Sequence, residues 1–253
     1  MEATDKRGNS ERGVQAINIQ RRVELFGDSL LKGIQIDPLS LRYHINNNID
    51  VEKIEKTHLL NIRNFAKFGC TVTKGYALIE KRLRSDEPFC DAIVMDFGGN
   101  DCDFDWNAVS ERPDDEHLPN TPLDVFKETY YKIIELLKYN GIRPIITSLP
   151  PLDAKRFFHW FCNGLNKANV LKWLGDMHAI YRWQESYSIA AVKIAIETNT
   201  LLVDLRGAFL EHKNLQDLLC EDGTHPNTQG QKVITQTFLK FIENAKAKGE
   251  LLI

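Results

Sequence analysis

Short apolar segments alternate with longer segments of helical periodicity along almost the whole chain, and this alternation limits the possible folds more than any other feature of the sequence. Five segments are predicted to be strands because they are apolar and end in glycine, proline or polar residues. They are residues 22–26, 61–69, 91–99, 143–151 and 200–205. Parallel strands need long crossover connections, so the alternation favours an α/β fold with a parallel sheet covered on both faces.

The intervening segments carry apolar residues at helical spacing. Helices are expected over residues 30–45, 71–83 and 122–141, in a longer stretch that ends near Thr198, and after Pro226. No linker and no internal repeat divides the chain. We therefore predict one doubly wound domain, with a sheet of about five parallel strands, over residues 21–253.

Charge and hydropathy exclude several classes of function. With a formal net charge of -3 over 253 residues, the chain lacks the basic surface expected of a nucleic-acid-binding protein. No apolar run is long enough for a membrane helix, and neither an HExxH motif nor EF-hand spacing occurs. We expect no catalytic metal, no cofactor, and neither a nucleic acid nor a membrane as partner.

The N-terminal segment and the cysteines bear on where the protein acts. Residues 1–20 are polar and lack the apolar core of a signal peptide, so we expect a mobile N-terminal arm. The 5 Cys residues form no CxxC pair, which favours reduced thiols over a disulfide framework. Both observations favour a cytoplasmic protein.

Polar or glycine residues follow the predicted strands, where doubly wound folds bind their ligands. Ser29 follows the first strand, Gly69 the second and Asn100 the third. These three loops are neighbours if the second and third strands flank the first. Asp222 and His225 follow the fifth strand, and the stretch before them is long enough to return toward the first strand.

These residue types are the components of acyl transfer. A serine hydroxyl is a weak nucleophile at neutral pH and needs a base, which a histidine can supply while an acidic residue fixes its tautomer. The tetrahedral oxyanion needs preorganised donors. The N–H of Ser29 at a helix start, the N–H of Gly69 and the amide of Asn100 are candidates for these donors.

Four stretches resemble, in order, the four signature blocks of the SGNH hydrolases, also called GDSL-type esterases and lipases. They are FGDSL (26–30), Gly69 in KFGCTV, GGND (98–101) and DGTHP (222–226). One block alone would be a weak signal, but four in the right order span almost the whole chain. The chain departs from the pattern in one mild way, since Cys70 stands where many members have a small polar residue.

The resemblance implies a role for each matching residue. Ser29 would be the nucleophile, His225 the base and Asp222 its orienting acid. Ser29, Gly69 and Asn100 would form the oxyanion hole. The implied fold is a three-layer α/β/α sandwich of flavodoxin-like type, which agrees with the predicted strands and helices.

Simpler interpretations exist for single residues. Ser29 alone would be interpreted as a helix N-cap. Asp28 and Asp101 are expected to be structural, each accepting backbone N–H groups around its turn. Cys70 and Cys102 flank the proposed site, but free cysteine is commonly a small buried apolar residue, so a cysteine nucleophile is disfavoured.

The stretch 150–190 holds three of the four Trp residues of the chain. It is interpreted as an aromatic wall over the substrate, as helix packing, or as the interface of a homo-oligomer. Trp160 and Trp183 are candidate substrate-binding residues within it. Trp106, shortly after Asn100, is a better single candidate.

The sequence thus predicts a serine ester hydrolase that acts through an acyl-enzyme on a small-molecule ester. A short acyl group, such as acetyl on a carbohydrate, is the substrate hypothesis, because no long apolar segment is present to form a lipid tunnel. An acyltransferase or thioesterase using the same residues is the nearest alternative. The alternative from another class is a non-catalytic binding protein on the same fold.

Overall fold

A parallel five-stranded sheet forms the centre of the computed structural model, which describes residues 20–46, 51–87 and 90–250. The strands are β1 (Arg21–Gly27), β4 (Leu60–Asn64), β5 (Ala92–Asp96), β6 (Arg143–Thr147) and β7 (Leu201–Val203). Their order is β4-β1-β5-β6-β7, so the first strand lies between the second and third, as the site hypothesis required. The expected N-terminal arm lies outside the described residues except for Gln20, and the single domain over 21–253 stays a prediction.

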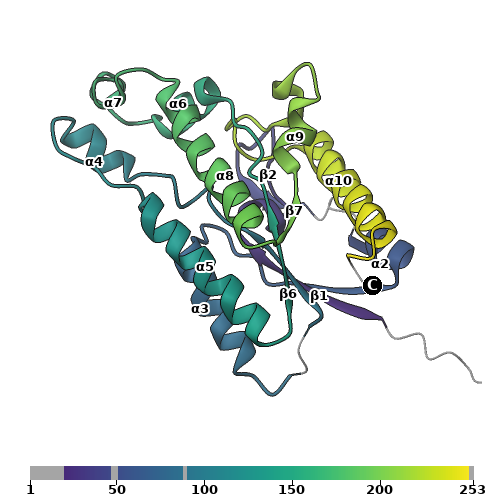
Figure 1. Ribbon diagram of the computed structural model, residues 1–253. Coiled ribbons are helices and arrows are strands. Elements are labelled where there is room, and N and C mark those ends of the chain that lie inside the picture. The colour runs from purple at the N-terminus through teal and green to yellow at the C-terminus, as the bar shows by residue number, and fades with distance from the viewer. Residues whose placement is uncertain (1–19, 47–50, 88–89, 251–253) are drawn as a thin grey trace, which may run out of the picture.

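Helices cover both faces of this sheet, giving three layers (Figure 1). The helices are α1 (Ser29–Lys32), α2 (Val51–His58), α3 (Val72–Leu83), α4 (Trp106–Glu111), α5 (Leu123–Tyr139), α6 (Ala154–Phe161), α7 (Lys167–Leu174), α8 (Ala179–Glu197), α9 (Leu205–Leu210) and α10 (Thr228–Ala247), with a 3₁₀ turn, η1 (Leu215–Leu218). Residues of α3, α5 and α8 form one buried cluster with the sheet, and residues of α2, α9 and α10 form another. The predicted α/β/α sandwich is confirmed.

The prediction of one helix over residues 30–45 is wrong. Helix α1 ends at Lys32, because Gly33 adopts the left-handed conformation (φ 75°) and donates its N–H back to Leu30 and Ser29. The chain then forms an antiparallel hairpin of β2 (Ile34–Ile36) and β3 (Tyr43–Ile45). The alternating Ile-Gln-Ile sequence of β2 suits a strand.

Other boundaries differ because polar loops were included in the expected elements. The third and fourth strands end at Asp96 and Thr147, before the residues that carry the candidate site. The long helical stretch is three helices, α6, α7 and α8, of which the last ends at Glu197, next to the expected Thr198.

A buried ion pair ties α3 to the central strand. Glu24 of β1 is 2% exposed and accepts hydrogen bonds from Nε and Nη2 of Arg82, at 3.0 and 2.6 Å. The pair anchors the C-terminal end of α3 to the sheet, while the N–H of Lys67, in the loop that carries Gly69, donates to the carbonyl of Gly27 at the end of β1 at 3.0 Å.

We expect Glu24→Ala to lower the free energy of unfolding by about 3–5 kcal/mol, because it leaves the Arg82 guanidinium buried without this partner. Urea denaturation measures the change. The matched control is Glu128→Ala, which removes an exposed pair with Lys132 on α5 and should cost less than about 0.5 kcal/mol. Equal small losses for both variants would contradict the structural role of Glu24.

Candidate active site

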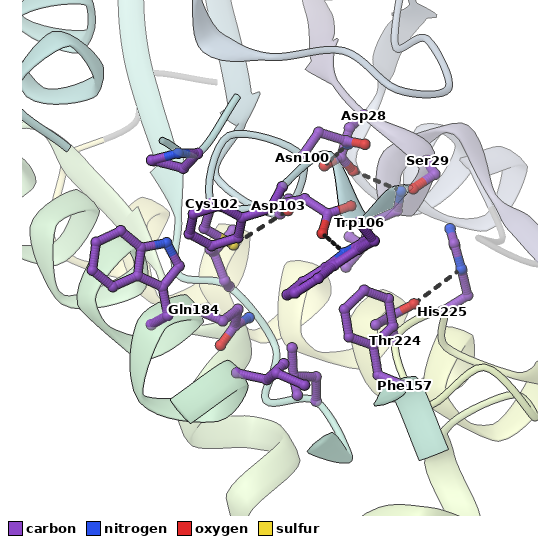
Figure 2. A pocket seen from close by; sticks show the side chains of 18 of the residues that line it. Asp28, Ser29, Asn100, Cys102, Asp103, Trp106, Phe157, Gln184, Thr224 and His225 are labelled. Carbon is purple, nitrogen blue, oxygen red and sulfur yellow. Dashed lines mark hydrogen bonds between the residues drawn. The ribbon is translucent and has the colours of Figure 1, made fainter. Parts of the chain in front are cut away.

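A cavity of about 600 Å³ lies at the carboxyl end of the sheet. It is lined by residues that follow β1, β5 and β6, by residues of α7 and α8, and by the loop before α10. Ser29, Asn100 and His225, three residues that the sequence placed in the site, are among its lining residues (Figure 2). They come together because the parallel strands direct their carboxyl ends to one edge of the sheet.

Ser29 is the first residue of α1, and Asp28 before it is the N-cap. The Asp28 carboxylate accepts the N–H of Leu30 at 2.9 Å, as expected of a structural residue at this turn. The simpler interpretation of Ser29 as an N-cap therefore fails, because the cap position is already filled. Its hydroxyl is left to the cavity.

The second carboxylate oxygen of Asp28 connects this turn to the Asn100 loop. It accepts a hydrogen bond from Nδ2 of Asn100 at 2.8 Å (Figure 2). Since an amide nitrogen carries two hydrogens, Asn100 keeps one for another acceptor. Asp28 thereby fixes the position of both Ser29 and the Asn100 amide.

His225 is oriented by a buried carboxylate. Its Nδ1 is hydrogen-bonded to Asp222, which is 1% exposed and also accepts the N–H groups of Thr224 and His225 at 3.1 Å each. Burial alone raises the pKa of the Asp222 carboxyl. The hydrogen bond and charge of His225, with those N–H groups, outweigh burial and hold the pKa of Asp222 below its usual value.

The other ring nitrogen of His225, Nε2, is buried and has no partner among the described residues. Figure 2 shows a ring nitrogen of His225 pointing in the direction of Ser29. In the described part of the chain no hydrogen bond joins the Ser29 hydroxyl to Nε2. Such catalytic contacts are often long without substrate. A histidine whose second ring nitrogen has no partner, in a cavity that a serine also lines, is suited to accept the serine proton.

Gly69 has less structural support as an oxyanion-hole residue than Ser29 and Asn100 have. Its φ of +69° favours glycine, although a Cβ there would meet no atom within 4 Å. Gly69 is absent from the lining of the cavity, whereas its neighbour Phe68 is part of it. Its place in the oxyanion hole stays a prediction.

The Gly69 and Asn100 loops are nevertheless connected. Asp101 accepts the N–H of Val72, at the start of α3, at 2.9 Å, which is the structural role expected of it. Burial raises the pKa of this Asp101 carboxyl to about 6.

The tryptophans divide into two groups. Trp106 and Trp183 line the cavity, as the sequence hypothesis required of substrate-binding residues. Trp160 does not line it. Its Nε1 donates to the hydroxyl of Tyr43 at 3.0 Å, so Trp160 supports the cavity rim from outside.

Sequence reasoning missed two aromatic residues beside His225. Tyr43 of β3 packs its ring edge-on against the imidazole with 5.3 Å between centroids, and Phe68 stacks on it at 6.2 Å. The sequence predicts Tyr43 to lie within a helix, so its contact with His225 could not be inferred. A local signal for Phe68 existed, because it directly precedes Gly69 in the glycine block.

The cysteines near the site are unsuited to nucleophilic attack. Burial raises the pKa of the Cys70 thiol to about 11 and the pKa of the Cys102 thiol well above its ordinary value. Because the thiolate is the reactive form, these shifts disfavour a cysteine nucleophile.

A second buried carboxyl faces the cavity behind Asp28. Asp96 ends β5, is 1% exposed and is hydrogen-bonded by the hydroxyl of Thr147. Burial, and then the charge of Asp28, raises the pKa of Asp96 to about 8. Burial also raises the pKa of Asp28, against the lowering effect of its hydrogen bonds.

Within the described residues, no three His, Cys, Asp or Glu side chains gather closely enough to hold a metal ion. Over the same ranges, no helix combines the length and apolar character needed to cross a membrane.

Comparison with known proteins gives a match over most of the chain. Residues 25–233 match the GDSL-like lipase/acylhydrolase family. A GDSL esterase/lipase of Arabidopsis thaliana, CPRD49, is 25% identical over 157 residues, which are 61% of this chain and 55% of that protein. The matched region thus spans about half the length of this curated relative.

Solved structures share the fold at low identity. The lipase/acylhydrolase from Enterococcus faecalis aligns with a TM-score of 0.61 and 19% identity, over 89% of this chain and 96% of that one. Axe2, an acetylxylan esterase from Geobacillus stearothermophilus, aligns with a TM-score of 0.59 and 19% identity over the same shares. At this identity the likeness concerns the fold.

The raised pKa of Asp96 predicts a pH-dependent stability. An unfolded aspartate titrates near about 3.9, so between about pH 4 and pH 8 the folded chain binds more protons at Asp96 than the unfolded chain does. The free energy of unfolding should fall as pH rises through this window. In Asp96→Asn, the free energy of unfolding should fall less over this window than in wild type. We expect the difference to exceed about 1.4 kcal/mol, the equivalent of one pKa unit.

Urea denaturation of wild type and Asp96→Asn at pH 5 and pH 8 measures the difference. Asp124→Asn, at an exposed carboxyl in the first turn of α5, is the control and should keep the wild-type pH dependence. Identical pH dependence in wild type and Asp96→Asn would show that Asp96 titrates normally.

Proposed function

Because this chain belongs to the GDSL-like lipase/acylhydrolase family, we propose that it is a carboxylic ester hydrolase with Ser29 as its nucleophile. One observation carries the proposal. His225 is held through Nδ1 by the buried carboxylate of Asp222, while its Nε2 is unpartnered in the cavity that Ser29 lines. That arrangement suits a general base for a serine hydroxyl.

In the proposed first step, Nε2 of His225 takes the proton of the Ser29 hydroxyl as Oγ bonds to the carbonyl carbon of the ester. The imidazole becomes an imidazolium, which the neighbouring Asp222 carboxylate stabilises. The C=O π electrons move to the carbonyl oxygen, which becomes an oxyanion.

The oxyanion requires donors that are in place before the charge forms. The backbone N–H of Ser29, at the start of α1, and the second Nδ2 hydrogen of Asn100 are the proposed donors. The N–H of Gly69 is the third. The fixed contact between Asp28 and Asn100 means that this amide need not reorganise during the reaction.

The intermediate then collapses. The C–O bond to the alcohol breaks, and His225 gives its proton to the departing oxygen, leaving the acyl group on Ser29. A water molecule, deprotonated by His225, attacks the acyl carbon through a second oxyanion, and Ser29 leaves with its proton restored. The products are the alcohol and the carboxylic acid.

The alternatives use the same residues. An acyltransferase or thioesterase would differ in the acceptor or leaving group, and no observed contact favours either. A non-catalytic binding protein would be favoured by loss of Ser29, Asp222 or His225, all of which are present. A cytoplasmic location and homo-oligomerisation stay predictions.

Replacing the nucleophile should abolish hydrolysis without harming the fold. We expect Ser29→Ala to lower kcat on any cleaved p-nitrophenyl ester by roughly 10⁴-fold or more, and the Ser29→Ala/His225→Ala double variant to lose about as much as either single variant. The control is Ser186→Ala, at a serine of α8 that does not line the cavity. Near wild-type turnover by Ser29→Ala would contradict the proposed nucleophile.

The Asn100 amide is tested separately. If it donates to the oxyanion, Asn100→Ala should lower kcat by roughly 10²–10³-fold, the effect of a lost oxyanion-hole donor, with KM changed only a few-fold. Steady-state kinetics on a p-nitrophenyl ester measures both constants, and thermal denaturation checks the fold.

Asn120→Ala is the matched control, because Nδ2 of Asn120 anchors the same loop by donating to the carbonyl of Asn100 at 2.9 Å. It should lower kcat less than tenfold. Similar losses in the two variants would mean that loop position, and not the Asn100 amide, limits the rate.

A further inference from the structure

Beyond Ser29, the cavity opens into an aromatic chamber. We define this chamber by six of the lining side chains, Phe104, Trp106, Leu152, Trp173, Ile180 and Trp183. They come from the loop after β5, the segment after β6, and helices α4, α7 and α8. We propose that the chamber binds the acyl group of the substrate and selects bulky, uncharged, apolar acyl groups over acetyl. This inference rests on the proposed ester hydrolysis and names its acyl class.

The walls of the chamber are mutually packed. The ring of Phe104 contacts those of Trp173, Trp106 and Trp183, with centroids 5.0, 5.5 and 5.8 Å apart. Trp106 also stacks on Phe161 at 4.0 Å. Its Nε1 donates to Asp103 at 2.7 Å, so its polar atom is satisfied. The chamber is therefore preorganised and does not need to open for a ligand.

The size of the cavity exceeds the needs of an acetyl group. Its volume of about 600 Å³ lies within the range of roughly 300–1,000 Å³ typical of pockets that enclose drug-sized ligands. An acetyl group adds a single methyl beyond the carbonyl and would leave most of the aromatic wall uncovered. A longer acyl chain would bury apolar surface against it, and each methylene buried should raise kcat/KM roughly fourfold.

The position of His225 assigns the chamber to the acyl group. The departing oxygen must lie within reach of His225, because that residue protonates it. His225 borders an open rim, where Tyr43 is 43% exposed and Phe68 57% exposed. The alcohol can leave through this rim.

The acyl group must then extend toward the other end of the cavity. Figure 2 shows Ser29 and His225 at one end of the pocket, Gln184 and Cys102 at the other, and Trp106 between them. The chamber lies along this direction, away from the rim.

The charges along the cavity favour an uncharged acyl group. Among the described residues that line it, acidic side chains occur at Asp28, Asp96, Asp103 and Glu116, but no lysine or arginine does. Gln184 is already paired, since its Nε2 donates to Pro150 at 2.8 Å and its Oε1 accepts from Arg206 at 3.1 Å. An anionic acyl group would find no cationic partner there.

Two substrate series test the inference on the wild-type protein. Across p-nitrophenyl esters from acetate to decanoate, which share one leaving group, kcat/KM should rise roughly fourfold per methylene at first and exceed that of acetate at least tenfold at hexanoate. Across acetate esters of methanol to hexanol, it should vary less than tenfold. A p-nitrophenyl hemisuccinate should be cleaved at least tenfold more slowly than the pentanoate.

A variant that narrows the chamber makes the test specific. Ala179, the first residue of α8, lines the cavity next to Ile180 of the chamber, so Ala179→Phe should lower kcat/KM for hexanoate relative to acetate at least tenfold. Ala247→Phe, at the exposed end of α10, is the control and should keep the wild-type order of substrates. If thermal denaturation shows that Ala179→Phe is unfolded, Ala179→Leu replaces it.

Acetate as the best acyl group, or a substrate order that Ala179→Phe and Ala179→Leu leave unchanged, would overturn the inference and leave the proposed hydrolysis standing. The inference would also be overturned if kcat/KM varied strongly with the alcohol group and little with the acyl group. Failure of the wild-type protein to cleave any ester in either series would count against the proposed function itself, and the inference would fall with it.

Discussion

Parallel pairing on both sides of β1 is the constraint on which the candidate site depends. Because β4 and β5 pair with β1 along its length, the loops that follow the three strands meet at one edge of the sheet. The Asp28 carboxylate then joins two of these loops by accepting from Leu30 and from Asn100. The proposed nucleophile and the proposed oxyanion donor are held by backbone geometry and one buried carboxylate.

The sequence predicted those parts of the site that local signals specify. Apolar runs followed by Ser29, Gly69 and Asn100 indicated strand ends, and the resemblance of DGTHP (222–226) to a family block implied the pairing of Asp222 with His225. The observed strand order and the contact between Asp222 and His225 agree with these hypotheses.

The rim and the chamber could not be predicted in the same way. Tyr43 reaches His225 only because Gly33 ends α1 and a hairpin follows, and the apolar residues of this segment fit a helical pattern equally well. Trp160 and Trp183 lie in the same aromatic stretch, yet Trp183 lines the cavity and Trp160 supports Tyr43 from outside. Helical periodicity does not distinguish a residue that lines the cavity from one that lies outside it. That difference depends on how α6, α7 and α8 pack on α4 and β6. The proposed acyl chamber is likewise assembled from separate short segments, so its size cannot be inferred from the length of any single apolar run.

The central claim is that Ser29 becomes covalently bonded to the acyl group. Reaction with a fluorophosphonate, followed by intact-mass measurement and peptide mapping, tests it most directly, while ester hydrolysis is followed in the same samples. The account predicts one phosphonyl group per chain on Ser29, with hydrolysis lost in proportion to its labelling. Attachment at another residue, or hydrolysis that persists after Ser29 is fully labelled, would contradict it.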